Sequence, residues 1–589
     1  MVMYGGLCLQ LYVQGDKHKI WPLKHHQAPD PLASNTVEMA REWLRECAEN
    51  HDGCRVRFNS KSLPSRLIDV GYSDKSGDFS VPHLIDTHGS LPSEMKTGND
   101  WQYVTLSHCW GKSTHLSTKK NTLNERKYAI PVKSLNKTYA DAVRVTRELQ
   151  MRYLWIDSLC IIQDSDEDWI EESSKMCFVY NNAKFNIAAA AALDGDSGFL
   201  PKRLSVKIGH VLRSDRKTIA RSLWIRPCIQ TGNANGEVGI SLPCPLFGRA
   251  WVLQESILAA RTMIYSPVGM HFRCRMSKRS DEDPVKDAGD LDIFVGSKLA
   301  TFPFLALNKG QKQFYSPREI DTWYQLLEVY SGKQILHRKD KLPAVAGLAY
   351  QLGSIIGDTY LAGLWARDFP QALCWLPHRP SSGCVRRSKL PADIEYSAPS
   401  WSWASCHTLF SYAPVAFKSA KLLTEDIPPG YYSCPDYENT DILWDAMLVG
   451  AHMDFVSNRY GPVKSGSITV KGHLLKIDIS CFVSPFRENV AVYNGLALGT
   501  FYADAKLDLS KKYWALLLGY ERRKTTIKSC SSTKECTLVL LKPMRDGMER
   551  RICLGLILMN FGCGSFKRVA YFQKFDAVWP PETRDVVIW

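Results

Sequence analysis

Short apolar segments alternate with helical ones between residues 101 and 265, and this alternation constrains the fold more than any other feature. Residues 103–107 and 153–157 are apolar runs of strand length, and residues 185–191 form another strand or buried segment. Strands that alternate with helices usually form a parallel sheet with helices on its faces. We therefore predict an α/β fold with a mainly parallel sheet for residues 101–265.

Two helices are predicted between these strands. Residues 139–150 carry apolar side chains at helical spacing. Residues 166–182 begin after Ser165, which with Asp168 resembles a capping box, and acidic residues in the first turn suit the helix dipole. Trp169 starts the apolar stripe of this second helix. We expect that stripe to face the sheet.

The sequence predicts three further segments around this region. Residues 1–100 form an N-terminal flank with a helix at 38–50, an extended stretch at 63–70 and a long loop at 77–100. Residues 266–420 form a mixed helical region whose tryptophans, by their density, indicate packing: Trp365, Trp375, Trp401 and Trp403. Residues 421–589 form a β-rich domain with strands predicted at 467–477, 496–502, 513–520, 536–542, 552–559 and 569–572.

Composition excludes several classes of protein. The 589 residues carry a net charge of +14, but the basic residues are scattered, so no nucleic-acid partner is predicted. The sequence has no apolar run of about 18 residues and no signal peptide, so we expect neither a membrane span nor secretion. The 18 cysteines include no CxxC pair, which favours reduced thiols. We expect a cytoplasmic protein.

The stretch LSHCWGKST (residues 106–114) suggests two chemistries, and neither fits. A P-loop needs glycine five positions before Gly111, where this chain has Leu106. Ser107 and His108 are neighbours in a strand and point to opposite faces, so a nucleophile with its base is not favoured. We interpret the stretch as the end of a strand followed by a tight turn at Gly111.

Three residues near the N-terminus have the spacing of metal ligands. Cys47, His51 and Cys54 form C-x3-H-x2-C, but no fourth ligand lies nearby in the sequence. A cysteine that packs a helix and an exposed histidine explain the pattern more simply. We therefore predict no metal site.

Glu172 occupies an unusual position on the helix at 166–182. At about 100° per residue it lies at the edge of the apolar stripe, where a carboxylate costs free energy unless it is paired or used. One explanation, favoured by the helix alone, is an ion pair with an arginine such as Arg144 or Arg249. The other is a catalytic or ligand-binding acid that faces the sheet edge.

Ligands of open α/β sheets bind beyond the carboxyl ends of the strands. Residues 107–111 follow the first strand, and Asp157, Ser158 and Cys160 follow the next, so these segments are expected to line one crevice. Asp157 has an equally good alternative role, which is to cap a helix or hold a loop.

Three blocks of sequence resemble the fungal heterokaryon-incompatibility (HET) domain. They are YVTLSHCWG (103–111), RYLWIDSLCIIQDSDEDWIEESSKMCFVYNNAKFNIAAAAALDGDSGFL (152–200) and RAWVLQESILAAR (249–261). The chain departs from the usual pattern at Ala250, where most such domains have glycine, and at His108, where many have tyrosine. Neither change removes an ionisable residue of the motifs.

The resemblance implies a protein of fungal self/non-self recognition whose activation triggers cell death. It also implies a fold similar to Toll/interleukin-receptor (TIR) domains, some of which cleave NAD with a helix glutamate beside a tryptophan. Trp169 and Glu172 resemble that pair, with a spacing one residue shorter than usual. NAD is then a substrate, and no bound cofactor is expected.

An NAD glycohydrolase needs a carboxylate that stabilises an oxocarbenium-like transition state. We assign this role to Glu172, with Asp157 orienting a ribose hydroxyl. In the ligand-binding set, Trp110 stacks on a ring, amides near Gly111 hold phosphate, a basic side chain neutralises it, and two serines line the crevice: Ser107, Trp110, Gly111, Lys112, Arg144, Ser158 and Trp169.

Two other functions fit the same resemblance. The HET domain can act as a non-enzymatic signalling adaptor that oligomerises, with the C-terminal region as its sensor. The chain can also be an accessory protein of a secondary-metabolite pathway. The partners implied are other incompatibility or signalling proteins and, for the adaptor, further copies of this chain.

Overall fold

The structure is a computed structural model of the whole chain. It describes residues 2–4, 7–13, 27–55, 63–71, 80–87, 101–111, 116–211, 221–227, 244–281, 317–377, 396–406, 410–412, 440–480, 489–493, 496–503, 511, 513–523, 552–562, 565–575 and 582–589.

The chain divides into two compact units, each built from two separate stretches of sequence. Unit 1 comprises Met1–Tyr315 and Gly332–Ile356, and unit 2 comprises Ser316–Ser331 and Gly357–Trp589. The polypeptide therefore passes from one unit to the other three times.

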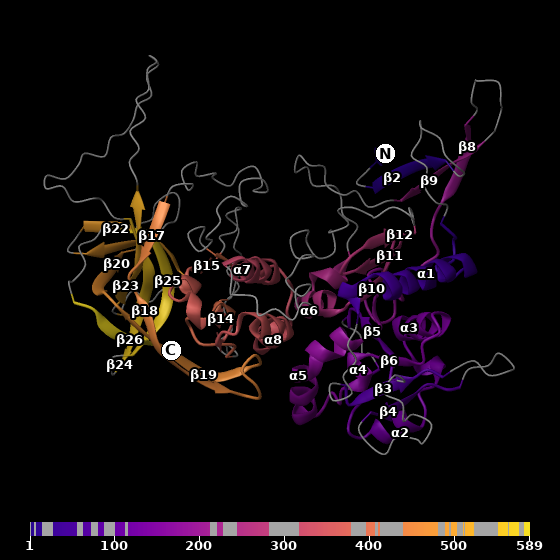
Figure 1. Cartoon of the computed structure of the whole chain (residues 1–589), viewed down its shortest axis with the longest axis horizontal. Coiled ribbons are helices and arrows are strands. Elements are labelled where there is room, and N and C mark those ends of the chain that lie inside the picture. Colours follow the sequence, from indigo (N-terminus) through magenta and orange to yellow (C-terminus); the bar gives the residue numbers. More distant parts are fainter. Residues whose placement is uncertain are drawn as a thin grey trace, which may run out of the picture. The chain divides into compact units, whose positions relative to one another are not determined.

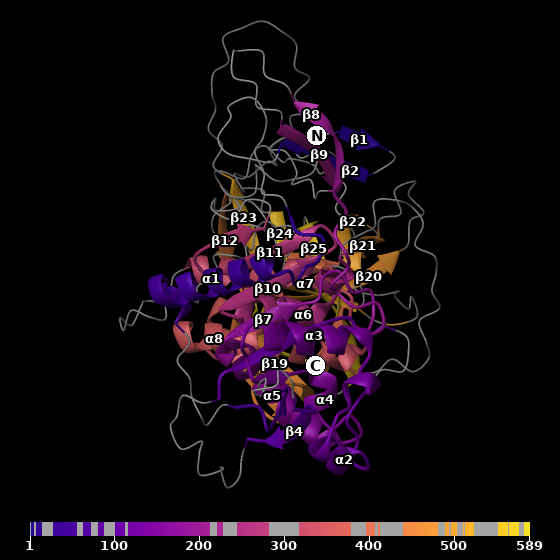
Figure 2. The ribbon, with the colours of Figure 1, turned by 90° about the vertical axis from the view of Figure 1, so that its right-hand side faces the viewer.

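The strands that the structure describes in unit 1 form two sheets. They are β1 Val2–Tyr4, β2 Leu7–Val13, β3 Arg66–Asp69, β4 His83–Asp86, β5 Tyr103–Ser107, β6 Tyr153–Trp155, β7 Phe185–Ala188, β8 Val206–Val211, β9 Arg221–Pro227, β10 Arg261–Ser266, β11 Gly269–Cys274 and β12 Lys278–Ser280. Over the described residues, the larger sheet has eight strands in the order β12-β11-β10-β7-β5-β6-β3-β4. The smaller sheet, β1-β2-β9-β8, lies around the N-terminus (Figure 2).

The centre of the larger sheet is parallel and its two sides are antiparallel. Strands β10, β7, β5 and β6 pair in parallel, whereas β3, β4, β11 and β12 pair antiparallel. Every residue of β5, β6 and β7 is buried, as expected for parallel strands that are covered on both faces. Short connections link β10, β11 and β12, which accounts for the antiparallel pairing on that side of the sheet.

Helices cover both faces of this sheet. The helices of unit 1 are α1 Ser34–Asn50, α2 Leu123–Tyr128, α3 Lys137–Glu148, α4 Asp157–Cys160, α5 Asp166–Asn182, α6 Ala250–Leu258 and α8 Pro343–Ile356. Figure 1 shows β5, β6 and β10 between α1 and α3 on one side and α5 and α6 on the other. Helix α8 packs against both α5 and α6.

Side-chain caps begin two of these helices. Asn136 accepts a hydrogen bond from the backbone N–H of Tyr139 at the start of α3. Ser165 accepts one from the backbone N–H of Asp168 at the start of α5. The predicted capping residue of α5 is therefore confirmed. Caps of this kind typically stabilise a helix by about 1 kcal/mol.

Unit 2 combines helix α7 Pro317–Ser331 with a large sheet. Its strands are β13 Tyr360–Leu361, β14 Leu364–Trp365, β15 Trp375–Pro377, β16 Phe410–Tyr412, β17 Thr440–Trp444, β18 Met447–Phe455, β19 Val463–Gly472, β20 Leu474–Ser480, β21 Asn489–Tyr493, β22 Leu496–Ala503, β23 Tyr513–Arg523, β24 Ile552–Gly562, β25 Ser565–Phe575 and β26 Arg584–Ile588. Over the described residues, ten of them (β17 to β26) form one sheet (Figure 1), which is antiparallel apart from the β25–β26 pair.

Buried tryptophans form the core beside this sheet. Trp323 and Trp403 both donate from Nε1 to the carbonyl of Gly363, at 3.0 and 3.1 Å. Gly363 has φ +101°, and a Cβ there would lie 2.3 Å from the Trp403 indole nitrogen, so only glycine fits. The guanidinium of Arg568 lies 3.4 Å from the ring centre of Trp375 and donates to its carbonyl at 2.6 Å.

Several predicted elements differ from the structure in detail. The helix expected at 38–50 starts four residues earlier, at Ser34. The strand expected at 467–477 is two strands, β19 and β20, separated at His473. The strand predicted at 536–542 lies outside the described residues.

The mainly parallel sheet predicted for residues 101–265 corresponds to the four central strands of unit 1. Strands from the predicted flank 1–100 belong to the same sheet, because β3 pairs with β6. Among the described residues, no helix has both the length and the apolar character that crossing a membrane requires.

Candidate functional site

Polar residues gather at the carboxyl ends of the parallel strands of unit 1. Ser107 is the last residue of β5, and its Cα is in register with Ala188 at the end of β7. Asp157 follows β6, which is paired in parallel with β5. Because parallel strands end at the same edge of a sheet, these residues lie close together, as the sequence predicts.

Ser107 holds a buried carboxylate at this edge. Its hydroxyl donates a hydrogen bond to Glu255 of α6 and accepts one from the side-chain amide of Asn186 at 3.0 Å. The exposed fractions of Ser107 and Glu255 are 1% and 6%. Glu255 is thus positioned through a strand end that belongs to a distant part of the sequence.

Glu255 has an unusual acidity for a glutamate. Burial is the largest cause that raises its pKa from the ordinary 4.5 to about 7. The hydrogen bond from Ser107 acts in the opposite direction, and the negative charge of Asp157 adds to the effect of burial. A carboxyl that titrates near neutral pH can exchange its proton under physiological conditions.

Asp157 connects the turns that follow two strands. Its carboxylate accepts hydrogen bonds from Trp110 Nε1 at 2.9 Å and from the backbone N–H of Ser158 at 2.7 Å. The carboxylate is 26% exposed, and Trp110 is half-buried, so both are accessible to a ligand. Asp157 is also the first residue of α4, which fits the loop-holding role weighed for it.

His108 is the first residue after β5 and is buried. Its Nε2 is 3.0 Å from the hydroxyl of Tyr139, which in turn is 2.7 Å from the hydroxyl of Ser158. Its Nδ1 is 3.8 Å from the carboxylate of Asp157. The chain from His108 to Ser158 fixes the ends of β5 and β6 relative to each other.

Arg249 supplies a positive charge at the same edge. It stands at the N-cap of α6 and donates to the carbonyl of His108 at 2.5 Å. It also donates to the thiol of Cys109, whose pKa is raised by burial. Arg249 is half-buried and close enough to Glu255 to favour its ionised form. A partly accessible guanidinium suits an anionic ligand.

Gly111 is required by the turn itself. Its φ is +75°, and a Cβ at this position would lie 2.4 Å from the Cβ of Asp194. The glycine predicted to end the turn is therefore needed for close packing. Lys112, predicted to neutralise a phosphate, lies outside the described residues.

Glu172 has its contacts elsewhere, at the start of β3. It is fully buried, and its carboxylate accepts hydrogen bonds from the Ser65 hydroxyl at 2.6 Å and from Lys175 Nζ at 3.0 Å. The ion pair that the sequence suggests is present, but its cation is Lys175, one turn along α5. Arg144 instead lies 3.9 Å from Asp141 and is largely exposed.

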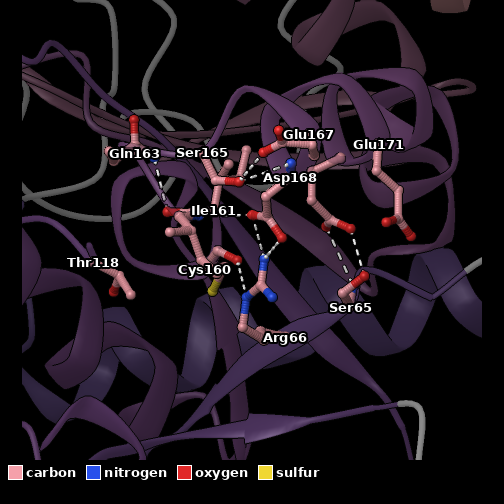
Figure 3. Close-up of polar contacts among 12 residues, drawn as sticks. Ser65, Arg66, Thr118, Cys160, Ile161, Gln163, Ser165, Glu167, Asp168 and Glu171 are labelled. Atoms are coloured by element: carbon pink, nitrogen blue, oxygen red, sulfur yellow. Dashed lines mark hydrogen bonds and ion pairs between the residues drawn. The ribbon is translucent and has the colours of Figure 1, made fainter. Parts of the chain in front are cut away.

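The neighbouring contacts attach the first turn of α5 to β3 (Figure 3). Arg66 donates to both carboxylate oxygens of Asp168, at 2.6 and 2.5 Å, and to the carbonyl of Cys160 at 2.7 Å. Ser65 precedes Arg66 in the chain, so the same segment holds Glu172 and Asp168. The contacts of Glu172 therefore hold α5 against the start of β3.

The structure thus brings together four predicted site residues: Ser107, Trp110, Asp157 and Ser158. The contacts of Arg144 and Glu172 lie on other parts of unit 1, and Trp169 is half-buried in the first turns of α5. The catalytic role assigned to Glu172 stays a prediction.

Glu255 is not among the site residues predicted from the sequence, although the composition of helix α6 points to it. Helix α6 reads AWVLQESIL, in which the residues other than Gln254, Glu255 and Ser256 are all apolar. A helix with so few polar residues is expected to be buried, and so is its one acidic residue. The signal was in a block already identified as part of the family pattern.

Comparison with known proteins identifies this part of the chain. No curated protein and no solved structure matches the chain. A family model described as heterokaryon incompatibility protein (HET) matches residues 103–255, from the first residue of β5 to Glu255. The segment that carries the strand ends, Asp157 and Glu255 is therefore a HET domain.

Proposed function

We propose that this chain acts in fungal self/non-self recognition and cell death, and that its HET domain does so by cleaving NAD in the cytoplasm. The match to the heterokaryon incompatibility family supports the biological role. The observation that carries the chemistry is Glu255, a buried carboxylate with a pKa of about 7 beside Asp157 and Arg249. Perturbed carboxyl groups of this kind are typical of active sites.

The proposed fold of the HET domain is TIR-like, and the position of Glu255 supports it. Trp251 and Glu255 stand four residues apart on α6. This is the spacing usual in NAD-cleaving TIR domains, whereas Trp169 and Glu172 are one residue closer. Glu255 is therefore a better match than Glu172 for the helix glutamate of those enzymes.

The proposed reaction is hydrolysis of the bond between nicotinamide and ribose. The C1′–N bond breaks, and its electron pair leaves with neutral nicotinamide. Ionised Glu255 stabilises the positive charge that develops on the ribose. Water then adds to C1′ and loses a proton, so the products are nicotinamide and ADP-ribose. No acid is needed for the leaving group, because nicotinamide departs uncharged.

The other residues at this edge have roles that fit their geometry. Asp157 orients a ribose hydroxyl, and Trp110, which donates to it, offers an indole face for stacking. Arg249 is the cation for the pyrophosphate. Ser107 orients Glu255 through its hydrogen bond and is a positioning residue.

The test compares two glutamates in the full chain. Purified protein is incubated with NAD, and release of nicotinamide is measured for the wild type, Glu255→Gln and Glu172→Gln. Loss of one electrostatic group in an active site typically costs about 3 to 4 kcal/mol, so Glu255→Gln should lower turnover by about 10²- to 10³-fold. Glu172→Gln should retain most of the activity when both variants are folded.

The outcomes separate the assignments. Full activity in Glu255→Gln with loss in Glu172→Gln would transfer the catalytic role to Glu172. Absence of nicotinamide release from the wild type, also when it is fused to a module that forces oligomerisation, would contradict NAD cleavage and favour the adaptor function.

A further inference from the structure

Three cysteines and a histidine of unit 1 converge at one point outside the HET domain match. Cys47 lies in the last turn of α1, His51 follows that helix, and Cys54 ends the short 3-10 helix Asp52–Cys54. Cys274, the last residue of β11, completes the group. The ligand atoms of the four residues all lie within 4.8 Å of one another.

The sequence offers only three of these residues as neighbours, and the fold supplies the fourth. His51 Nδ1 is 3.3 Å from the sulfur of Cys274, although the two residues are 223 positions apart. His51 is half-buried rather than exposed, and the three cysteines are buried. The missing ligand that weighed against a metal site in the sequence is therefore present in the structure.

The spacing of the four atoms suits a tetrahedral ion. Zinc binds sulfur at about 2.3 Å and histidine nitrogen at about 2.0 Å, which places ligand atoms roughly 3.5 to 3.8 Å apart. The His51 Nδ1 and Cys274 Sγ atoms are slightly closer than this, at 3.3 Å. All four ligand atoms lie within 4.8 Å of one another, so small adjustments bring them to the zinc distances.

N–H groups surround the sulfur atoms. Arg261 Nε donates to Cys47 at 3.1 Å, and its side chain is buried. The backbone N–H groups of Met276 and Ser277 lie 3.4 and 3.2 Å from Cys274. The backbone N–H of Arg275 donates to Cys54. Such donors stabilise thiolates, and they are the outer contacts usual for metal-bound cysteine.

Two simpler explanations fit less well. Cysteines that merely fill a core do not need N–H donors directed at their sulfurs. A disulfide would join two of the three thiols and would leave both the third thiol and the imidazole without a reason to converge there.

We propose that Cys47, His51, Cys54 and Cys274 bind one structural zinc ion. Four protein ligands leave no open coordination position, so the ion is structural rather than catalytic. The ion joins α1 and the turn after it, both in the N-terminal flank, to β11 of the larger sheet. Both α1 and β11 lie outside residues 103–255. The ion therefore stabilises the elements that flank the HET domain in the sequence.

The test measures metal in the intact chain. Full-length protein, produced in zinc-supplemented cells and purified without chelator, should contain about one zinc ion per chain by plasma mass spectrometry. Cys54→Ser and Cys274→Ser should lose it. Cys177→Ser is the matched control, because Cys177 is also buried but bonds to the carbonyl of Gly347 in another part of unit 1, and it should keep the ion.

Two further measurements keep the result clear if the serine variants fail to fold. Replacement of zinc by Co²⁺ in the wild type should give the thiolate-to-cobalt and tetrahedral d–d absorption bands. Removal of zinc from the wild type by a chelator should lower the melting temperature, and added zinc should restore it. Metal-free wild type with all three thiols reactive, or with two of them in a disulfide, would overturn the proposal.

Discussion

The hydroxyl of Ser107 donates a hydrogen bond to the carboxylate of Glu255, 148 residues further along the chain. The first residue ends the strand that opens the HET domain, and the second ends the region that matches the family. The contact therefore joins the beginning and the end of the domain. It lies at the carboxyl ends of the parallel strands, where ligands of open α/β sheets bind. It also makes Glu255 sensitive to any change at the end of β5.

The proposed NAD cleavage should increase with pH around neutrality. Only ionised Glu255 can stabilise a positive transition state, and its pKa is about 7. Turnover of the wild type should therefore rise from pH 6 to pH 8 and then level off. Nicotinamide release measured in buffers of constant ionic strength checks this. A profile that is already flat between pH 5 and 8 would show that a group with an ordinary carboxyl pKa controls the reaction.

The same carboxyl should make the protein less stable as pH rises. Glu255 ionises at about 4.5 in the unfolded chain but only at about 7 in the folded one, so folded protein keeps the proton while unfolded protein has lost it. At about 1.4 kcal/mol per pKa unit, the free energy of unfolding falls by about 3 kcal/mol across this window.

Glu255→Gln removes this pH dependence, because glutamine does not titrate. Relative to the wild type, the variant should gain about 2 to 3 kcal/mol of stability between pH 5 and pH 8. Urea unfolding at both pH values measures the difference. An identical difference between variant and wild type at the two pH values would contradict the raised pKa.

Gly111→Ala should destabilise the turn after β5. Alanine is strained at φ +75°, and its Cβ would clash with Asp194. The expected loss is about 1 to 3 kcal/mol, visible as a lower melting temperature. Gly209→Ala is the control, because a Cβ there meets nothing within 4 Å and φ is not positive. Equal effects of the two changes would rule out the steric explanation.

Arg66→Met should destabilise unit 1 strongly. The side chains of Arg66 and Asp168 are only 9% and 15% exposed, so the substitution leaves a nearly buried carboxylate without its cation. Breaking such a pair costs about 3 to 5 kcal/mol. Lys120→Met breaks an exposed pair with Glu167 at 4.0 Å, and a loss below about 1 kcal/mol is expected. Thermal unfolding of both variants tests the contrast.

Local patterns predicted the elements of the HET domain well. Strand β5 and helix α5 have the bounds expected from their apolar periodicity and from the cap at Ser165. The strand expected to end at Asp157 is shorter, because Asp157 already starts α4. Boundaries shift in this way when a side chain can serve a strand end and a helix start equally well.

The site was harder to predict because its contacts are distant in sequence. Glu172 attracted attention through its place on one helix, yet its cation, Lys175, is a local partner. Glu255 depends on Ser107, and the fourth residue of the cysteine group depends on β11. The periodicity of a single segment cannot predict such contacts, because they form only when distant segments come together in the folded sheet.

The threefold passage of the chain between the two units has a consequence for truncated genes. Helix α8 belongs to unit 1, and its Gly347 donates a backbone hydrogen bond to the side chain of Gln254, the residue before Glu255. A premature stop codon before α8 would remove the helix that packs against α6, which carries Glu255. It would also remove at least most of unit 2. Alleles that encode only the family-matched segment should therefore behave as loss-of-function alleles rather than as freely active fragments.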